Sequence, residues 1–289
     1  MFRCREILNK KIFKNCEDCP DFILNKLIPL NKQVDINKIS DSWKRCSCGK
    51  RPLDAVMAHI LKIMIDEKDL NKNACLRDVG SPLLTPMYYF EHYPYLPKES
   101  LVLLSPHISK ETAERIVNEV SEVKGVIKGN ISELGNYRLL SGSDARCDIV
   151  ETPVGCISLF KKQSQIHIEL PKKHDPKIVT LYNHMKNLSD FTVLDATCGV
   201  GTLGIFSLKM GARRVIFNDI WPPATYMTLK NLEINGFKNG FEIYNLDVLK
   251  LIQILKENFD LCILDLFPGM DPKKFIYKMK NCCKEIIVL

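Results

Sequence analysis

The chain has 289 residues, of which 46% are hydrophobic and 26% charged, a composition typical of a folded protein with one large or two modest domains. No apolar run approaches the roughly 20 residues of a membrane helix, and the chain start lacks the apolar stretch of a secretion signal. We therefore expect a cytoplasmic protein without a membrane partner. The net charge of +7 permits an anionic partner such as RNA, although a solvated basic surface explains it equally well.

Close cysteine pairs mark the first part of the chain, which holds six of the twelve cysteines. In a long chain without a secretion signal, reduced, buried or metal-bound thiols are favoured over disulfides. Cys16 pairs with Cys19 and Cys46 with Cys48, and zinc prefers four such thiolates around it. The pairs predict a metal site, with zinc favoured over an iron–sulfur cluster and unliganded thiols as the alternative. His59 lies on an apolar helix face nearby and is expected in the core rather than on the metal.

Residues 1–97 predict a cysteine-rich, mainly helical module. Apolar residues recur at helical spacing over residues 53–64, and a segment rich in proline and tyrosine follows over residues 86–97. For the aromatic side chains of this last segment, packing between domains is favoured over a surface that stacks on RNA bases.

Residues 98–175 predict a small α+β domain on the substrate side. An apolar strand is expected over residues 101–104 and a helix over residues 110–123. Short strands separated by glycine and proline are then expected at residues 137–140, 148–151, 156–160 and 165–170.

From residue 176 to residue 289 the pattern changes to strand, turn and helix in repetition. Apolar runs lie at residues 191–195, 214–219, 241–245, 259–265 and 285–289, separated by helix-length stretches. This alternation predicts an α/β domain with a Rossmann-like parallel sheet and helices on both faces. The chain ends on the fifth strand, so either the sheet has five strands or the preceding domain completes it.

A glycine-rich turn follows the first of these strands, with Gly199, Gly201 and Gly204 opening a helix. Such a turn needs left-handed backbone and close approach to a ligand, which any side chain would block. The spacing of the glycines also matches the dinucleotide fingerprint, so an NAD-dependent enzyme is an alternative.

Carboxylates at the strand ends favour S-adenosylmethionine (SAM) over NAD. Asp195, just before the glycines, is placed to receive an ammonium group and would repel a pyrophosphate. Asp219 ends the second strand, where it serves the ribose of either cofactor, and Asp247 ends the third, where it can bond an adenine amino group. Asp265 and Phe267 end the fourth strand, facing the reacting methyl group. Capping and turn roles are the alternative for these carboxylates.

Residues 190–289 resemble the class I, Rossmann-type SAM-dependent methyltransferases. Residues 195–201 resemble motif I of that family, and residues 218–220 resemble its acidic second-strand end. The order of parts, and the Asn231-x-x-x-Asn235 spacing, are similar to the archaeal and eukaryotic tRNA guanosine methyltransferases. The cofactor-binding residues that this resemblance implies are Asp195, Thr197, Gly199, Gly201, Asp219, Ile220 and Asp247.

Two departures from the family limit the expected chemistry. The fourth motif reads Asp265-Leu266-Phe267-Pro268 instead of an Asn-Pro or Asp-Pro-Phe-Gly type. The family's fold continues into two further strands, whereas the sequence here ends at Leu289. We expect methyl transfer to RNA, with tRNA favoured, Asp265 as the best-placed base and Phe267 stacking on a planar acceptor. A methyltransferase for a protein side chain or a small metabolite is the alternative, followed by a non-catalytic binding module. Cys198 in the cofactor turn is expected to pack rather than react.

Overall fold

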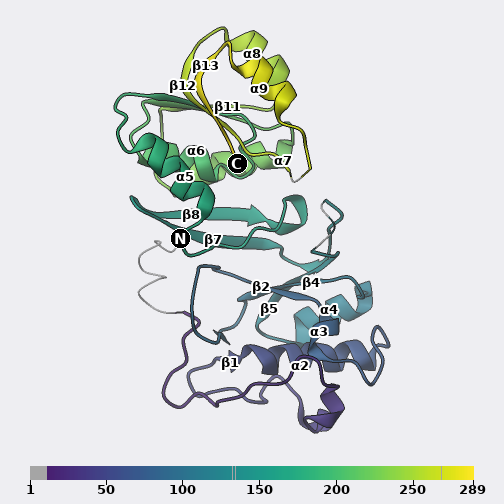
Figure 1. Ribbon diagram of the computed structural model, residues 1–289. Coiled ribbons are helices and arrows are strands. Elements are labelled where there is room, and N and C mark those ends of the chain that lie inside the picture. The colour runs from purple at the N-terminus through teal and green to yellow at the C-terminus, as the bar shows by residue number, and fades with distance from the viewer. Residues whose placement is uncertain (1–11, 132, 134, 268) are drawn as a thin grey trace. The chain divides into compact units, whose positions relative to one another are not determined.

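The computed structural model describes residues 12–289 except residues 132, 134 and 268 (Figure 1). The chain divides into two compact units, residues 1–146 with 162–169 and residues 147–161 with 170–289. The boundaries expected near residues 97 and 175 stay predictions. In the described part of the chain, no helix combines the length and apolar character needed to cross a membrane.

A four-stranded sheet forms the body of the first unit. Its strand order is β2-β4-β5-β6, with bounds Ser81–Leu84, Leu101–Ser105, Val123–Lys128 and Arg138–Gly142. The parallel pair β4 and β5 is joined by α4 (Lys110–Glu119), which begins where the Ser109 side chain accepts from the Thr112 amide. The outer strands β2 and β6 are antiparallel to their neighbours. The strand and helix expected at the start of this region are therefore confirmed.

The amino-terminal part of the same unit is built around the buried helix α2 (Leu53–Asp66). The short elements beside it are η1 (Leu30–Lys32), η2 (Ile36–Lys38), α3 (Leu76–Val79) and the strand pair β1 (Arg51–Pro52) and β3 (Tyr95–Leu96). His59 lies in α2 and is buried, as expected for a core residue, and its Nδ1 has no hydrogen-bond partner among the described atoms. Burial disfavours the charged imidazolium and lowers the His59 pKa to about 4.

The second unit contains the expected parallel sheet. Its strand order is β11-β10-β9-β12-β13, with bounds Phe241–Tyr244, Arg214–Asn218, Thr192–Asp195, Phe259–Leu264 and Cys283–Val288. All four neighbouring pairs are parallel, so the predicted fold class is confirmed. The described strands of the preceding region pair elsewhere and do not extend this sheet. The order reverses between β9 and β12, and ligands of open α/β sheets bind outside the carboxyl ends of strands at such a switch point.

Helices cover both faces of this sheet (Figure 1). On one face lie α5 (Pro176–Met185), α6 (Thr202–Lys209) and α7 (Pro222–Ile234), and on the other lie α8 (Val248–Leu255) and α9 (Lys273–Met279). The side chains of Leu194, Ile216 and Cys262, one from each of three neighbouring strands, form the core beneath α8 and α9. These fully buried strands explain the continuous apolar runs in the sequence.

A hairpin of β7 (Ala145–Thr152) and β8 (Gly155–Lys162) is held by the side chains of Asn231 in α7 and of Asn235 at its C-cap. The Asn231 amide accepts from the Phe160 amide at 2.6 Å and donates to the Phe160 carbonyl at 3.1 Å. The Asn235 amide does the same for Ser158, at 3.1 and 2.7 Å. Residues four apart on a helix rise about 6 Å, close to the roughly 6.7 Å between alternate residues of a strand, so each asparagine meets one backbone unit of β8.

Two sequence expectations are wrong. Residues 165–170 were expected to form a strand, but the chain forms η3 (Gln163–Gln165) and then irregular backbone, because the Asp144 carboxylate accepts from the Ser164 amide. Reduced, buried or metal-bound thiols were favoured over disulfides throughout the chain, but Cys262 and Cys283 form a disulfide. They lie on neighbouring parallel strands with a Cα–Cα distance of 5.9 Å, within the range that a bridge spans.

Candidate functional site

The turn between β9 and α6 and the first turn of α6 contain three glycines, and a side chain is disfavoured at each for a different steric reason. Gly199 and Gly201 have φ values of +53° and +85°, which disfavour side chains. A Cβ at Gly201 would lie 2.9 Å from Cγ2 of Thr228, and one at Gly204 would lie 2.2 Å from the Phe217 ring. A Cβ at Gly199 would meet nothing within 4 Å. Gly201 and Gly204 therefore permit close packing, whereas Gly199 leaves open space in front of the turn.

Asp195, the last residue of β9, has a fully buried carboxylate, and only one of its two oxygens accepts a hydrogen bond from the described residues. Its Oδ2 accepts from the Gly204 amide at 2.8 Å, as the cap of a helix N-terminus does. Its Oδ1 has no hydrogen-bond partner among the described atoms. Burial, with the carboxylates of Asp265 and Asp219 nearby, raises the Asp195 pKa to about 8. The residue therefore has one buried acceptor atom that a cationic group would satisfy.

Asp219 follows β10 and connects the glycine turn to the start of α7. Its Oδ2 accepts from the Gly199 amide and its Oδ1 from the Trp221 amide, both at 2.9 Å. Burial raises the Asp219 pKa despite these bonds. A carboxylate oxygen accepts more than one hydrogen bond, so both oxygens keep capacity for ribose hydroxyls. The next residue, Ile220, is 69% exposed beside this acid.

Asn218 ties three strand ends together, a role that the sequence analysis missed. Its side-chain amide donates to the carbonyls of Ala196 and Leu246, both at 3.0 Å, and accepts from the Leu246 amide at 3.1 Å. These bonds join the residues that follow β9 and β11 to the end of β10. The available signal in the sequence was an asparagine at the end of an apolar strand, directly before the strand-end acid.

Thr197 and Asp265 connect the two strands at the switch point. The Thr197 hydroxyl accepts from the Asp265 amide and donates to the Asp265 carbonyl, both at 2.9 Å. The Asp265 carboxylate accepts from Lys177 Nζ of α5 at 2.6 Å. The Thr197 hydroxyl therefore holds both the amide and the carbonyl of Asp265, and Lys177 balances the charge of the Asp265 carboxylate. The sequence analysis missed Lys177, because nothing in its local pattern distinguishes it from other lysines.

The remaining predicted residues lie at the same edge with other contacts. Asp247 follows β11, and its side chain accepts from the Leu249 amide at 2.8 Å as the N-cap of α8, the alternative role considered above. Phe267 follows β12 and is 57% exposed, while Pro268 lies outside the described residues. Cys198 is buried with its thiol 3.5 Å from the Thr228 hydroxyl, and burial raises its pKa well above the usual value. A neutral buried thiol fits a packing role.

Residues 178–267, from α5 to just beyond β12, match the family model of ribosomal protein L11 methyltransferase (PrmA). The carboxyl-terminal unit has the fold of a class I methyltransferase. Its strand order, glycine turn and strand-end acids agree with this match.

The curated relatives match short stretches of the chain. The ribosomal protein L11 methyltransferase of Aeromonas hydrophila is 47% identical over 58 residues, which cover 20% of each chain. The ribosomal RNA large subunit methyltransferase I of Vibrio cholerae is 34% identical over 100 residues, which cover 32% of this chain and 24% of that protein. The chain spans about a fifth to a quarter of the length of these relatives.

Similar solved structures cover more of the chain at low identity. The tRNA m1G37 methyltransferase of Methanocaldococcus jannaschii is 18% identical with a TM-score of 0.46, over 78% of this chain and 64% of that one. A putative transferase from Pyrococcus horikoshii is 19% identical with a TM-score of 0.47, over 77% of this chain and 74% of that one.

The four predicted metal-ligating thiols lie together in the first unit. The sulfur atoms of Cys16, Cys19, Cys46 and Cys48 all lie within 4.8 Å of one another. Neighbouring sulfurs are separated by 3.6 Å (Cys16 to Cys19), 3.4 Å (Cys16 to Cys46) and 3.7 Å (Cys19 to Cys48). Four thiolates at the usual zinc–sulfur distance of about 2.3 Å would be about 3.8 Å apart in a tetrahedron. The cluster therefore has the dimensions of a tetrahedral site.

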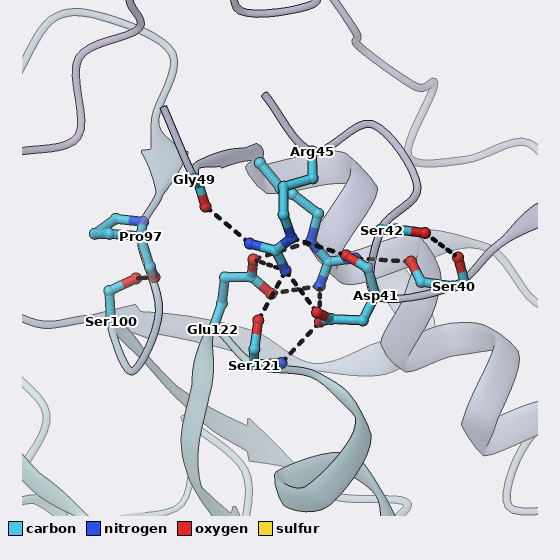
Figure 2. Close-up of polar contacts among 10 residues, drawn as sticks. Ser40, Asp41, Ser42, Arg45, Gly49, Pro97, Ser100, Ser121 and Glu122 are labelled. Atoms are coloured by element: carbon cyan, nitrogen blue, oxygen red, sulfur yellow. Dashed lines mark hydrogen bonds and ion pairs between the residues drawn. The ribbon is translucent and has the colours of Figure 1, made fainter. Parts of the chain in front are cut away.

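A buried charge network anchors the loop that carries the second cysteine pair (Figure 2). Arg45 donates to the Gly49 carbonyl within that loop at 2.8 Å. Its guanidinium also lies 2.9 Å from the carboxylates of both Asp41 and Glu122. Arg51, just after the loop, pairs with Glu122 and with Asp41. Two cations and two anions balance, so the loop is fixed to the body of the first unit without excess buried charge.

Proposed function

We propose that the chain is a SAM-dependent methyltransferase. The observation that carries this is the unpartnered Oδ1 of buried Asp195, behind a turn where Gly199 leaves open space. Asp195 Oδ1 would accept from the methionine ammonium of SAM, directly or through water, and Asp219 from the ribose hydroxyls. A side chain at Gly199 would fill the space that the cofactor needs. SAM would supply a methyl group on a sulfonium, which is an excellent leaving group.

In this proposal the protein aligns the methyl acceptor with the cofactor and accepts a hydrogen bond from the acceptor's N–H or O–H group. The Thr197 hydroxyl holds the Asp265 main chain, and Lys177 holds the Asp265 carboxylate at 2.6 Å. An oxygen of Asp265 would accept the N–H or O–H hydrogen of the acceptor and so orient its lone pair. The exposed ring of Phe267 would stack on a planar acceptor.

RNA is the acceptor class that we favour, and tRNA within it. The net charge of +7 suits phosphate contacts, and one curated relative is named for methylation of ribosomal RNA. The order of parts that the sequence shares with the tRNA guanosine methyltransferases supports tRNA. We also retain the cytoplasmic location expected from the sequence as part of this proposal.

A protein side chain is the second candidate acceptor. The family model that matches residues 178–267, and the relative with 47% identity, are both named for ribosomal protein L11. The matched residues lie in the second unit, which contains the proposed cofactor site.

We further propose that the four-thiol cluster binds zinc and that the metal stabilises the first unit. The sulfur spacing fits four thiolates around one ion, and four soft ligands leave no open position for catalysis. Closed sites of this kind contribute to folding.

The test is transfer of labelled methyl from SAM into separated RNA, protein and metabolite fractions of the source cell. The control is Asp195→Asn, which keeps the size of the side chain but removes its charge. Label in RNA that depends on Asp195 supports the proposal, and label in protein alone favours the second candidate. Tight binding of NAD with no binding of SAM, measured by calorimetry, would refute SAM-dependent methyl transfer.

A further inference from the structure

The first unit contains a cavity of about 830 Å³ that the methyl-transfer site does not use. Its walls come from the segment before η1, from α2 and α3, and from the ends of β2 and β4. Most lining side chains are apolar, including Leu53, Met57, Leu76, Pro82 and Leu104. This volume lies within the range of small-ligand pockets and exceeds the size of a single base.

Two cations line the same cavity. Lys26 and Arg77 belong to adjacent segments, joined by a bond from the Arg77 amide to the Lys26 carbonyl at 3.2 Å. Both side chains are exposed, and neither has an ion-pair partner in the part of the chain that the structure describes. Leu27, which follows Lys26 and also lines the cavity, is 66% exposed. Unpaired positive charge beside an open apolar cavity suits a ligand with an anionic group and a mostly apolar, planar body.

We propose that this cavity receives one nucleotide of an RNA chain, with its base inside and the flanking phosphates on Lys26 and Arg77. This inference rests on the proposed RNA methyltransferase function and adds a second contact, in the other unit, for the same substrate. Single-stranded RNA is bound through splayed bases in pockets together with phosphate contacts from lysine and arginine.

A nucleotide within a chain fits these features better than a free nucleotide does. Free nucleotides are commonly held by rows of backbone amides at glycine-rich loops or at the N-termini of longer helices. Here the cations are two exposed side chains at the surface, where phosphates of a continuing chain pass. Asp54 and Ser81 also line the cavity and offer polar atoms to a base edge.

The experiment measures binding of a fluorescein-labelled, mixed-sequence, single-stranded RNA 12-mer to the full chain as a function of salt. The test variant is the double change Lys26→Gln with Arg77→Gln. Its matched control is Lys38→Gln with Lys98→Gln, two exposed lysines of the same unit that do not line the cavity. A second pair compares Leu27→Glu with Ile23→Glu, because both residues are 66% exposed but only Leu27 lines the cavity.

We expect the Lys26/Arg77 variant to lose about tenfold in affinity at low salt and to reduce the salt slope by about two. Leu27→Glu should weaken RNA binding, and both controls should stay within about threefold of the parent chain. SAM binding should be unchanged in all variants. Equal losses in each variant and its control would overturn the inference, as would binding of adenosine monophosphate as tight as that of the RNA. If the chain methylates RNA while the Lys26/Arg77 variant binds it normally, this inference alone fails; if no RNA is bound or methylated, the proposed function fails with it.

Discussion

Arg51 and Glu122 form an ion pair in which both side chains are 0% exposed, although 71 positions separate them in the sequence. Arg51 Nε donates to Glu122 Oε1 at 2.9 Å, and Arg51 Nη1 donates to the Ser40 carbonyl at 3.0 Å. Arg51 lies in β1, at the end of the cysteine loop, and Glu122 directly precedes β5, so the pair connects these two segments.

Removing one charge of this pair should be costly. We expect Glu122→Gln to lower the free energy of unfolding by about 3–5 kcal/mol, because it leaves the buried Arg51 and the partly buried Arg45 with one anion, Asp41. The matched control is Glu119→Gln, which removes the partner of Arg115 in an exposed pair and should cost under about 1 kcal/mol. Urea unfolding of both variants measures the difference, and equal losses would contradict the buried network.

Gly204 should not tolerate even one methyl group. We expect Gly204→Ala to destabilise the chain by about 1–3 kcal/mol, because its Cβ would lie 2.2 Å from the Phe217 ring. Gly204→Ala combined with Phe217→Leu should lose less than the sum of the two single changes, since the smaller side chain makes room. Thermal unfolding of the three variants measures this coupling. Strict additivity would mean that the two residues do not touch.

Binding of SAM should release a proton. Asp195 has a pKa raised to about 8 by burial, so it holds a proton below that pH, and a bound ammonium would favour the charged carboxylate. Affinity for SAM should therefore rise as the pH increases from 6 to about 8, where the cofactor's own amino group begins to lose its charge.

Calorimetry in two buffers of different ionisation enthalpy measures the released proton. Asp195→Asn should bind SAM more weakly and release none. A parent chain whose affinity is flat across this pH range would argue against the contact between Asp195 and the ammonium. For the protein alone the sign is the reverse: the raised pKa stabilises the folded state at low pH, and this contribution is lost as the pH rises through about 8.

Lys177 and Asp265 should act together in turnover. We expect Asp265→Asn to reduce kcat by about 100-fold with little change in SAM affinity, because its carboxylate is proposed to orient the acceptor. Lys177→Met should reduce kcat by a smaller factor and Lys177→Arg should restore part of it, since Lys177 holds that carboxylate. Lys284→Met is the control, because Lys284 pairs with Asp260 at the same 2.6 Å but at the start of β12. A loss in the control as large as in Lys177→Met would assign a structural role to both lysines.

One zinc ion per chain is expected in protein purified without chelator. Cys46→Ser should lower the zinc content and loosen the first unit while SAM binding is retained, because a closed thiolate site contributes to folding. Cys156→Ser, a change at a cysteine outside the cluster, is the control and should keep the metal. Elemental analysis and limited proteolysis measure these outcomes. Absence of both zinc and iron in the parent chain would reject the site.

The sequence by itself determined the features that depend on local spacing. Apolar runs separated by helix-length stretches predicted the parallel sheet, because a strand buried on both faces needs continuous apolar residues. The glycine turn and the strand-end acids Asp195 and Asp219 followed from that topology, since parallel strands end at one edge. Close cysteine pairs predicted the four-thiol cluster in the same way.

Only the tertiary structure decided which distant side chains meet. Lys177 and Asp265 lie 88 positions apart, and the Asn231 contact with Phe160 spans 71. The Cys262–Cys283 disulfide and the turn in place of a strand after β8 also depend on register and on contacts with other elements. Periodicity specifies which face of an element is buried, but it does not specify the partner on the other side. The packing of the whole unit decides which partner a buried face meets. Each of these side-chain contacts forms only once the elements between the two residues are in place.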